Sequence, residues 1–243
     1  DWSSDVCSSD LISTESGGIM KDGFKMNLYK HGDGIEGQDI SHLLEHIQIQ
    51  LGKNKSLDAK AITTLIKRAD NKPGHIALRG EIIIRNDVYA EKYSKLYPKA
   101  RSLIAGIVNS KTPDARIVRD MEIVFYELIH PSGQTFKEQF DLIAHMGFLV
   151  ANHRMMPVLE ESQLPEILME FKRASPYEID GIVLDDSSKP FARATKENPD
   201  YAVAFKMQLE DQIATTKVIN VEYNVSKHGT LAPRIEYEPV VIK

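Results

Sequence analysis

Four polar groups in this sequence stand inside or beside apolar runs that are typical of β-strands. They are Arg79-Gly80-Glu81, Tyr126, Asp180-Gly181 and Lys206. A strand end holds the backbone rigidly while its side chain still reaches a cleft, so carboxylates, a phenol and an amine placed there can form a binding or reaction site. Such groups cost free energy unless they are paired or used. The alternative is structural: ion pairs, a solvated Asp in a turn, and an aromatic ring at the edge of the core.

The elements that would position these groups follow from apolar periodicity and from capping and turn residues. Strands are predicted over 76–85, 119–130, 148–150, 201–209, 214–223, 231–237 and 238–242, with another begun by Asp180-Gly181. Helices are predicted over 41–51, 56–68, 135–146 and 163–171, and over a segment capped by Asn86-Asp87 that includes Tyr97. These elements predict an α+β fold, and the all-β composition of the last thirty or so residues suggests a second domain.

The predicted helix after Asn86 carries a set of tyrosines and a set of basic residues, and each set allows two interpretations. Tyr89, Tyr93 and Tyr97 recur every four residues, which favours a stripe facing the core over a row that stacks on bases. The interspersed positive charges fit either a phosphate-binding track or a solvated helix face. These charges are Lys92, Lys95, Lys99 and Arg101.

Composition places the chain among soluble globular proteins. Of 243 residues, 42% are hydrophobic and 27% charged, and no apolar run approaches the ~20 residues of a membrane span. The single Cys excludes a disulfide framework and a cysteine metal site. We expect a monomeric, cytoplasmic protein with no membrane partner.

The first eleven residues do not resemble the rest. They hold the only Cys, the only Trp and many Ser and Asp residues. They resemble a translated sequencing adapter, the alternative being a disordered native terminus, and we exclude them from fold reasoning. Without their three Asp residues the formal net charge changes from −5 to −2. A nearly neutral chain is not expected to coat DNA, although a local basic groove remains compatible with it.

Several segments together resemble the NAD-dependent DNA ligases over residues 28–243. PYEIDGIVL resembles the family's Asp-Gly strand, and YAVAFKM its lysine strand. HGDGIEGQDIS resembles an Arg-Gly-Asp-Gly segment, and RSLIAGIVN an Ala-Gly-x-x-Asn helix of the smaller viral and phage members. VEYNVSKHGTLAPRIEYEPVVI is similar to the start of the family's oligonucleotide-binding (OB) domain.

The resemblance implies a domain organisation. Residues 1–11 would be the non-native leader, and 12–209 an N-terminally truncated adenylation domain. This domain is an ATP-grasp-like nucleotidyltransferase fold of mixed antiparallel sheets with helices. Residues 210–243 would be the first strands of an OB-fold, cut short at the C-terminus and leaving an exposed strand edge.

The resemblance also implies a reaction. A lysine amine attacks the adenylyl phosphate of NAD and releases nicotinamide mononucleotide. The AMP then passes from this lysyl-AMP to the 5′-phosphate at a nick in double-stranded DNA. Attack by the 3′-hydroxyl seals the strand and releases AMP. Such phosphoryl chemistry needs cations near the phosphate, here a lysine and Mg²⁺.

Carried over residue by residue, the resemblance gives roles to the groups named first. Glu81 would hold the ribose and Mg²⁺, with Arg79 beside it in the nucleotide site, and Tyr126 would stack on adenine. Asp180 would lie near the nucleophile and Mg²⁺, and Lys206 would contact the adenylyl phosphate. DNA-binding positions would be Arg101, Lys172 and Arg173.

The sequence departs from the family at important positions. The family nucleophile belongs to a Lys-x-Asp-Gly motif, which the 243 residues do not contain. Lys21-Asp22-Gly23 lacks the intervening residue, so we interpret it as a turn, and we expect the true nucleophile to precede Ser13. We therefore expect no self-adenylation by this chain. His31 replaces the family's arginine, and Asp185 replaces a lysine for which Lys189 is a possible substitute.

Two other functions remain open. An ATP-dependent polynucleotide ligase or capping-type enzyme shares the strand motifs, but the GTLAPRIEYEPV segment favours NAD. A non-catalytic nucleic-acid-binding relative would keep the scaffold without the lysine.

Overall fold

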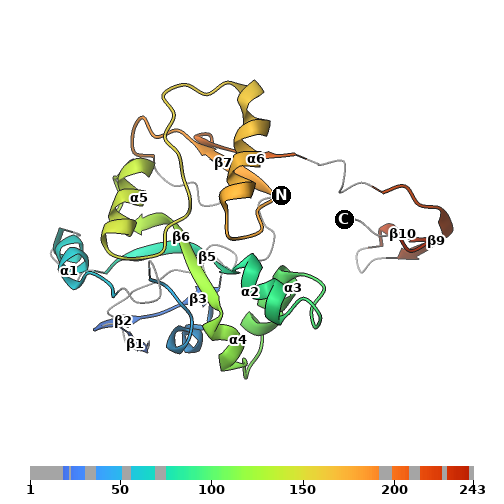
Figure 1. Ribbon diagram of the computed structural model, residues 1–243, viewed down its shortest axis with the longest axis horizontal. Coiled ribbons are helices and arrows are strands. Elements are labelled where there is room, and N and C mark those ends of the chain that lie inside the picture. Colours follow the sequence, from blue (N-terminus) through green and yellow to red (C-terminus); the bar gives the residue numbers. More distant parts are fainter. Residues whose placement is uncertain are drawn as a thin grey trace. The chain divides into compact units, whose positions relative to one another are not determined.

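The computed structural model describes residues 19–21, 23–30, 37–50, 56–68, 75–191, 199–207, 214–225 and 229–240. The predicted departure at His31 lies outside these residues. The chain divides into two compact units, one ending at Phe205 and the other beginning at Lys206. Figure 1 shows their helices and strands. No helix in the described ranges is long and apolar enough to cross a membrane.

The first unit is built on a long antiparallel hairpin. Strands β5 (Ala77–Ile84) and β6 (Met121–His130) are paired along their whole length, which confirms both predicted strands. The far edge of β6 bonds to two further extended segments. The amide of Ile123 donates to the carbonyl of Gln48 at 2.8 Å, and that of Phe125 to the carbonyl of Leu149 at 2.7 Å.

The two faces of this hairpin differ in chemistry. Alternating residues on one face are almost fully buried and form the centre of the core: Leu78, Ile82, Ile84, Met121, Ile123 and Phe125. The opposite face, here called the open face, carries polar and aromatic side chains, among them Arg79, Glu81, Glu122 and Tyr126. The period of two along each strand therefore separates the core from the groups expected to do chemistry.

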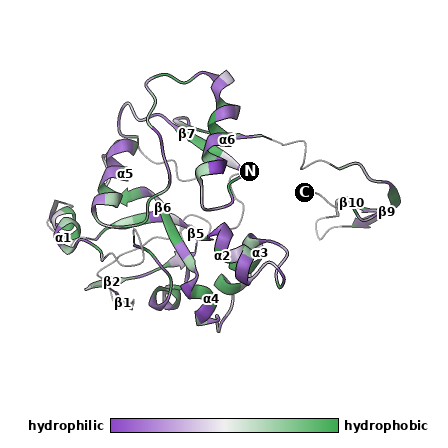
Figure 2. Ribbon diagram, viewed as in Figure 1, coloured by the Kyte–Doolittle hydropathy of each residue, from purple (hydrophilic) through white to green (hydrophobic). Residues whose placement is uncertain are grey.

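The unit also contains helices, several of which carry both hydrophobic and hydrophilic residues (Figure 2). They are α1 (Ala59–Arg68), α2 (Asn86–Lys92), α3 (Ala100–Val108), α4 (Ala115–Arg119), α5 (Phe136–His145) and α6 (Leu164–Ala174), with 3₁₀ turns η1 (Ser41–Glu45) and η2 (Glu161–Gln163). The predicted α5 is confirmed, and Thr135 caps it through a capping box with Glu138. Tyr93 is buried and Tyr89 and Tyr97 pack against the core, so the core-facing reading of the tyrosines is confirmed.

Some predicted boundaries were wrong. The helix predicted over 41–51 ends as η1 at Glu45, and residues 47–50 are extended against β6. The reason is the sequence Ile47-Gln48-Ile49-Gln50, in which both Ile are fully buried and alternate with Gln at a strand-like period of two. Helix α2 ends at Lys92, so Tyr97 lies beyond it.

The remaining predicted strands differ from the observed ones. Some form isolated bridges instead of a ladder, and others are shorter or begin and end at different residues. Residues 148–150 form isolated bridges to Gln50 and Phe125 rather than a strand. The region of the predicted strand 201–209 contains β8 (Ala202–Lys206), which pairs with β7 (Gly181–Asp185). Near the N-terminus, β1 (Ile19–Lys21) pairs with β2 (Phe24–Met26), and β3 (Tyr29–Lys30) with β4 (Gln38–Asp39).

The second unit contains an antiparallel pair, β9 (Val218–Val225) and β10 (Leu231–Tyr237). The predicted strand 231–237 is confirmed, and the one predicted over 214–223 begins later and ends at Val225. Residues 238–240 of a third predicted strand are not in a strand, and the rest of it lies outside the described residues. Every residue of β9 and β10 is exposed, including Val221, Tyr223 and Ile235.

Gly80 lets β5 approach β6 closely beside Glu81. A Cβ at this position would lie 2.7 Å from the Val124 carbonyl oxygen and 3.0 Å from side-chain atoms of Ile123 and Phe125. Backbone and core atoms cannot move away cheaply, so the absence of a side chain is a packing requirement.

We predict that Gly80→Ala lowers the free energy of unfolding by about 1–3 kcal/mol, because it overpacks the ladder. Urea denaturation followed by circular dichroism measures the change. The matched control is Gly106→Ala in α3, where no described atom lies within 4 Å of the added Cβ. There, replacing a helical Gly should stabilise by up to about 1 kcal/mol. Equal effects at the two positions would contradict the packing argument.

Candidate functional site

The open face of the hairpin positions Glu81 and Tyr126. Glu81 is paired across the ladder with Val124, so the two side chains leave the sheet on the same side. Gly80 is paired with Phe125 and Arg79 with Glu127, which makes Tyr126 the extra residue of a β-bulge. A bulge re-aims the side chain it carries, and the Tyr126 side chain is 38% exposed. An aromatic ring and a carboxylate therefore share one solvent-facing surface.

Two residues predicted for the site, Asp180 and Arg101, act electrostatically on a third, Glu81. The pKa of Glu81 is raised, first by desolvation from the surrounding protein, although part of its surface reaches solvent. The positive charge of Arg101 opposes this rise, and the negative charge of Asp180 adds to it. The charges of Asp180 and Arg101 are therefore near enough to Glu81 to shift its pKa. Arg101 lies in the first turn of α3 and Asp180 immediately before β7.

Arg79 occupies a cross-strand ion pair. Its guanidinium lies 3.3 Å from the carboxylate of Glu127, and both side chains are about four-fifths buried. Its Nε is buried without a hydrogen-bond partner among the described residues. Arg79 therefore has the structural role expected as the alternative to binding, which is an ion pair. Its expected part in nucleotide binding remains a prediction.

The turn that carries Asp180 is fixed to the hairpin by contacts that the sequence did not reveal. The Tyr177 hydroxyl donates to Glu122 Oε2 at 2.6 Å, and the Asn86 amide donates to the Pro176 carbonyl at 2.8 Å. In the sequence, the only indication of a role for Glu122 is that it shares a two-residue period with Val124 and Tyr126 on β6. A partner 55 positions away cannot be identified from that period.

The other predicted cations lie at element ends. Lys206 is the last residue of β8, the strand paired with the one that follows Asp180. Lys172 and Arg173 are in the last turn of α6, where basic side chains are favoured by the helix dipole. Their expected binding roles remain predictions.

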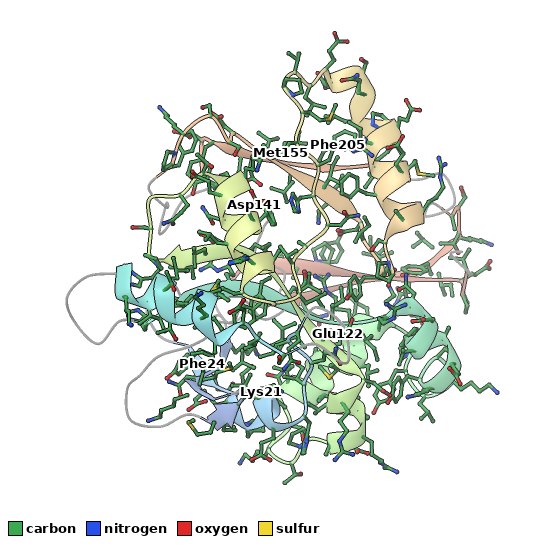
Figure 3. All side chains as sticks on the ribbon, turned by 60° about the vertical axis from the view of Figure 1, so that its left-hand side comes forward. Lys21, Phe24, Glu122, Asp141, Met155 and Phe205 are labelled. Carbon is green, nitrogen blue, oxygen red and sulfur yellow. The ribbon has the colours of Figure 1, made fainter. Side chains whose placement is uncertain are left out.

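Lys21 occupies a structural position. Its hairpin turns at Gly23, whose φ is +83°, and its Nζ donates to the carbonyls of Leu44 and Ile47 at 2.8 and 2.9 Å. Figure 3 labels Lys21 and Phe24, which belong to the two strands of this hairpin. Two carbonyl bonds hold the amine at the end of η1. Lys21 is therefore the last residue of β1 and Gly23 lies in a turn, whereas Asp22 is outside the described residues.

Asp185 brings a further carboxylate to the end of β7. Desolvation raises its pKa to about 6, even though part of its surface is open to solvent. The neighbouring Asp186 differs, because the Ser188 amide donates to its carboxylate at 2.8 Å and lowers its pKa. The pKa of Asp185 is therefore raised, whereas that of the neighbouring Asp186 is lowered.

The described residues contain no group of three or more His, Cys, Asp or Glu that could hold a metal ion. A protein cage for a cation is thus not formed by these residues alone. Glu81 and Asp180 are nevertheless a pair of interacting carboxylates. Mg²⁺ is commonly held by one or two carboxylates, with waters and substrate phosphates completing its shell, so the pair fits this cation.

We predict that Asp185→Asn stabilises the protein at neutral pH. The folded-state pKa of about 6 exceeds the ordinary 3.8, so the folded protein binds more protons between these values and wild-type stability falls as pH rises through them. The advantage of the variant should be absent below about pH 4 and complete above about pH 6. Urea denaturation at a series of pH values measures it. Asp186→Asn is the control and should destabilise at neutral pH; the same sign for both variants would contradict the assignment.

Comparisons with known proteins cover most of the chain. Residues 19–210 match the family model of the NAD-dependent DNA ligase adenylation domain. A DNA ligase of Acanthamoeba polyphaga mimivirus is 34% identical over 218 residues, covering 89% of this chain and 31% of the relative. A putative DNA ligase of Invertebrate iridescent virus 6 is 31% identical, covering 90% and 34%. The DNA ligase of Thermotoga maritima is 28% identical, covering 86% and 30%.

The chain thus spans about a third of the length of the curated relatives it matches. The match includes β5, β6, β7 and β8, the four strands that hold or directly follow the residues named first. By this match, the chain belongs to the NAD-dependent DNA ligase adenylation-domain family.

Proposed function

We propose that this chain binds the adenylate half of NAD on the open face of the β5–β6 hairpin, as part of a DNA ligase. One arrangement carries the proposal: the charges of Asp180 and Arg101 act on Glu81, which shares the open face with the bulge that exposes Tyr126. These residues come from β5, the start of β7, α3 and β6. A carboxylate, a cation and an aromatic ring are the groups that a ribose, a phosphate and a purine require.

Each side chain has a proposed task in holding the nucleotide. Tyr126 supplies an aromatic face for adenine, and Glu81 accepts hydrogen bonds from ribose hydroxyls. Lys206 supplies positive charge to the adenylyl phosphate at the end of β8. Glu81 and Asp180 together would hold Mg²⁺, which would neutralise charge on the phosphate when bound.

The larger enzyme is proposed to seal nicks in double-stranded DNA with NAD as adenylate donor, releasing nicotinamide mononucleotide and AMP. Arg101, Lys172 and Arg173 would contact DNA phosphates. The exposed apolar residues of β9 and β10 support their assignment to an OB-fold, because such strands bury one face in a complete barrel. The protein is proposed to act as a cytoplasmic monomer.

A second candidate function is a non-catalytic nucleotide- or DNA-binding relative. It is favoured by the two carbonyl bonds of Lys21, which engage the amine of the Lys-Asp-Gly segment. Both candidates share the adenylate pocket, and they differ in the covalent step.

We predict that the chain binds NAD and AMP, and that Tyr126→Ala weakens both by about five- to hundredfold, since base–aromatic stacking contributes roughly 1–3 kcal/mol. Isothermal titration calorimetry measures the affinities. Tyr223→Ala in β9, where the side chain is 69% exposed, is the matched control and should leave affinity unchanged. If wild-type protein binds neither ligand, the proposed nucleotide site is wrong. Tighter binding of ATP than of NAD would favour the ATP-dependent class.

We predict that the chain forms no covalent lysyl-AMP, because it offers no Lys-x-Asp-Gly nucleophile. The measurement is incubation with adenylate-labelled NAD and Mg²⁺, followed by denaturation and peptide mapping. A mimivirus DNA ligase preparation serves as the comparison reaction. A covalent label on a lysine of this chain, stable to denaturation and to alkali but labile in acid as a phosphoramidate is, would contradict the prediction and remove the non-catalytic candidate.

A further inference from the structure

We infer that Tyr177 and Glu122 are positioning residues that hold the Asp180 turn against the open face of the hairpin. The resemblance to the ligase family gave neither residue a role, and neither is proposed to touch the nucleotide. The inference rests on the proposed function, because the purpose of the contact is to set Asp180 beside Glu81 in the adenylate site.

The contact is a short hydrogen bond between neighbouring elements. The Tyr177 hydroxyl donates to Glu122 Oε2 at 2.6 Å, and both residues are half-buried. Desolvation raises the pKa of Tyr177, and the bond to Glu122 raises it further. The phenol therefore remains a neutral donor at physiological pH, and a hydrogen bond to a charged acceptor is stronger than one between neutral groups.

The backbone around Tyr177 is fixed as well. Ser175 Oγ donates to the Tyr177 carbonyl at 2.9 Å and accepts from its amide at 3.0 Å. The Pro176 carbonyl accepts from the Asn86 amide at 2.8 Å. Only Glu178 and Ile179 separate Tyr177 from Asp180, so the Cα atom of Asp180 can lie no more than about 10 Å from that of Tyr177.

The anchor and Glu81 belong to the same rigid ladder. Glu122 on β6 is paired with Ile83, and Val124, two positions along, is paired with Glu81 (Figure 3 labels Glu122). Glu122 and Glu81 therefore leave the sheet on the same face. Fixing Tyr177 to Glu122 consequently sets the distance between Asp180 and Glu81, the two carboxylates that already influence each other.

The test is a set of variants of the 243-residue chain with NAD affinity as the readout. Tyr177→Phe and Glu122→Ala should each weaken NAD binding about three- to tenfold, whereas Glu122→Gln should retain most of the affinity, because its amide oxygen still accepts the bond. In an Asp180→Asn background, Tyr177→Phe should cause little further loss, since a positioning residue acts through the group it holds. Independent losses that simply add would overturn the inference.

The matched control is Tyr89→Phe. Tyr89 also donates a hydrogen bond from a half-buried phenol, to the Tyr97 carbonyl at 2.7 Å. Each Phe variant loses one hydrogen bond from a half-buried phenol, to a carboxylate in Tyr177→Phe and to a backbone carbonyl in Tyr89→Phe, so both should lower the unfolding midpoint. Tyr89→Phe should not change NAD affinity. Equal weakening by the two variants would show a general loss of stability and overturn the inference.

Hydrogen exchange separates this inference from the proposed function. Peptides covering 175–185 should exchange faster in Tyr177→Phe and Glu122→Ala than in wild type, with no change in Tyr89→Phe. If wild-type protein does not bind NAD but this local change occurs, the proposed function fails and the anchor stands as a structural device. If exchange in 175–185 is unchanged, the anchor itself is refuted, whatever the NAD affinity.

Discussion

The β5–β6 ladder is the constraint on which the rest of the first unit depends. Its buried face forms the centre of the core, and its open face presents Glu81 and Tyr126. Core formation and presentation of the site depend on each other through the two-residue period of a strand. If the pairing register shifted by one residue, the buried and open faces would be exchanged. Gly80 and the bulge at Tyr126 lie next to each other in the ladder, so close packing and the exposure of the aromatic ring are set by the same local irregularity.

The candidate site places a second carboxylate within electrostatic reach of Glu81. Desolvation raises the pKa of Glu81 most, and the negative charge of Asp180 raises it further. Arg101 offsets part of this rise from α3. A carboxylate whose pKa is raised by desolvation and by a second carboxylate is a candidate functional group, because such groups cluster at binding and catalytic sites.

The amount that could be predicted from the sequence depended on the range of the interactions. The β-branched runs of β5 and β6, and the Thr135 capping box of α5, are local signals, and they were recognised. Residues 47–50 were misassigned because a short apolar alternation fits a helix face until a partner strand fixes it. The Tyr177–Glu122 bond joins residues 55 positions apart, and the desolvation of Asp185 depends on tertiary packing, so neither has a local signature.

Strand β7 is held at its two ends by different contacts, so the side chains at the two ends can differ in charge independently. Its entry is fixed to the hairpin through Tyr177 and Glu122. Beyond its exit, Ser187 Oγ accepts from the Lys137 amide in α5, and the Asp186 amide donates to the Tyr201 carbonyl. Because these attachments use different partners, the acidic residue at position 185 changes the charge at the exit without requiring the Asp180 turn to move. The departure from the family's lysine therefore alters the electrostatics of the site while leaving the geometry of Glu81 and Asp180 to the entry anchor.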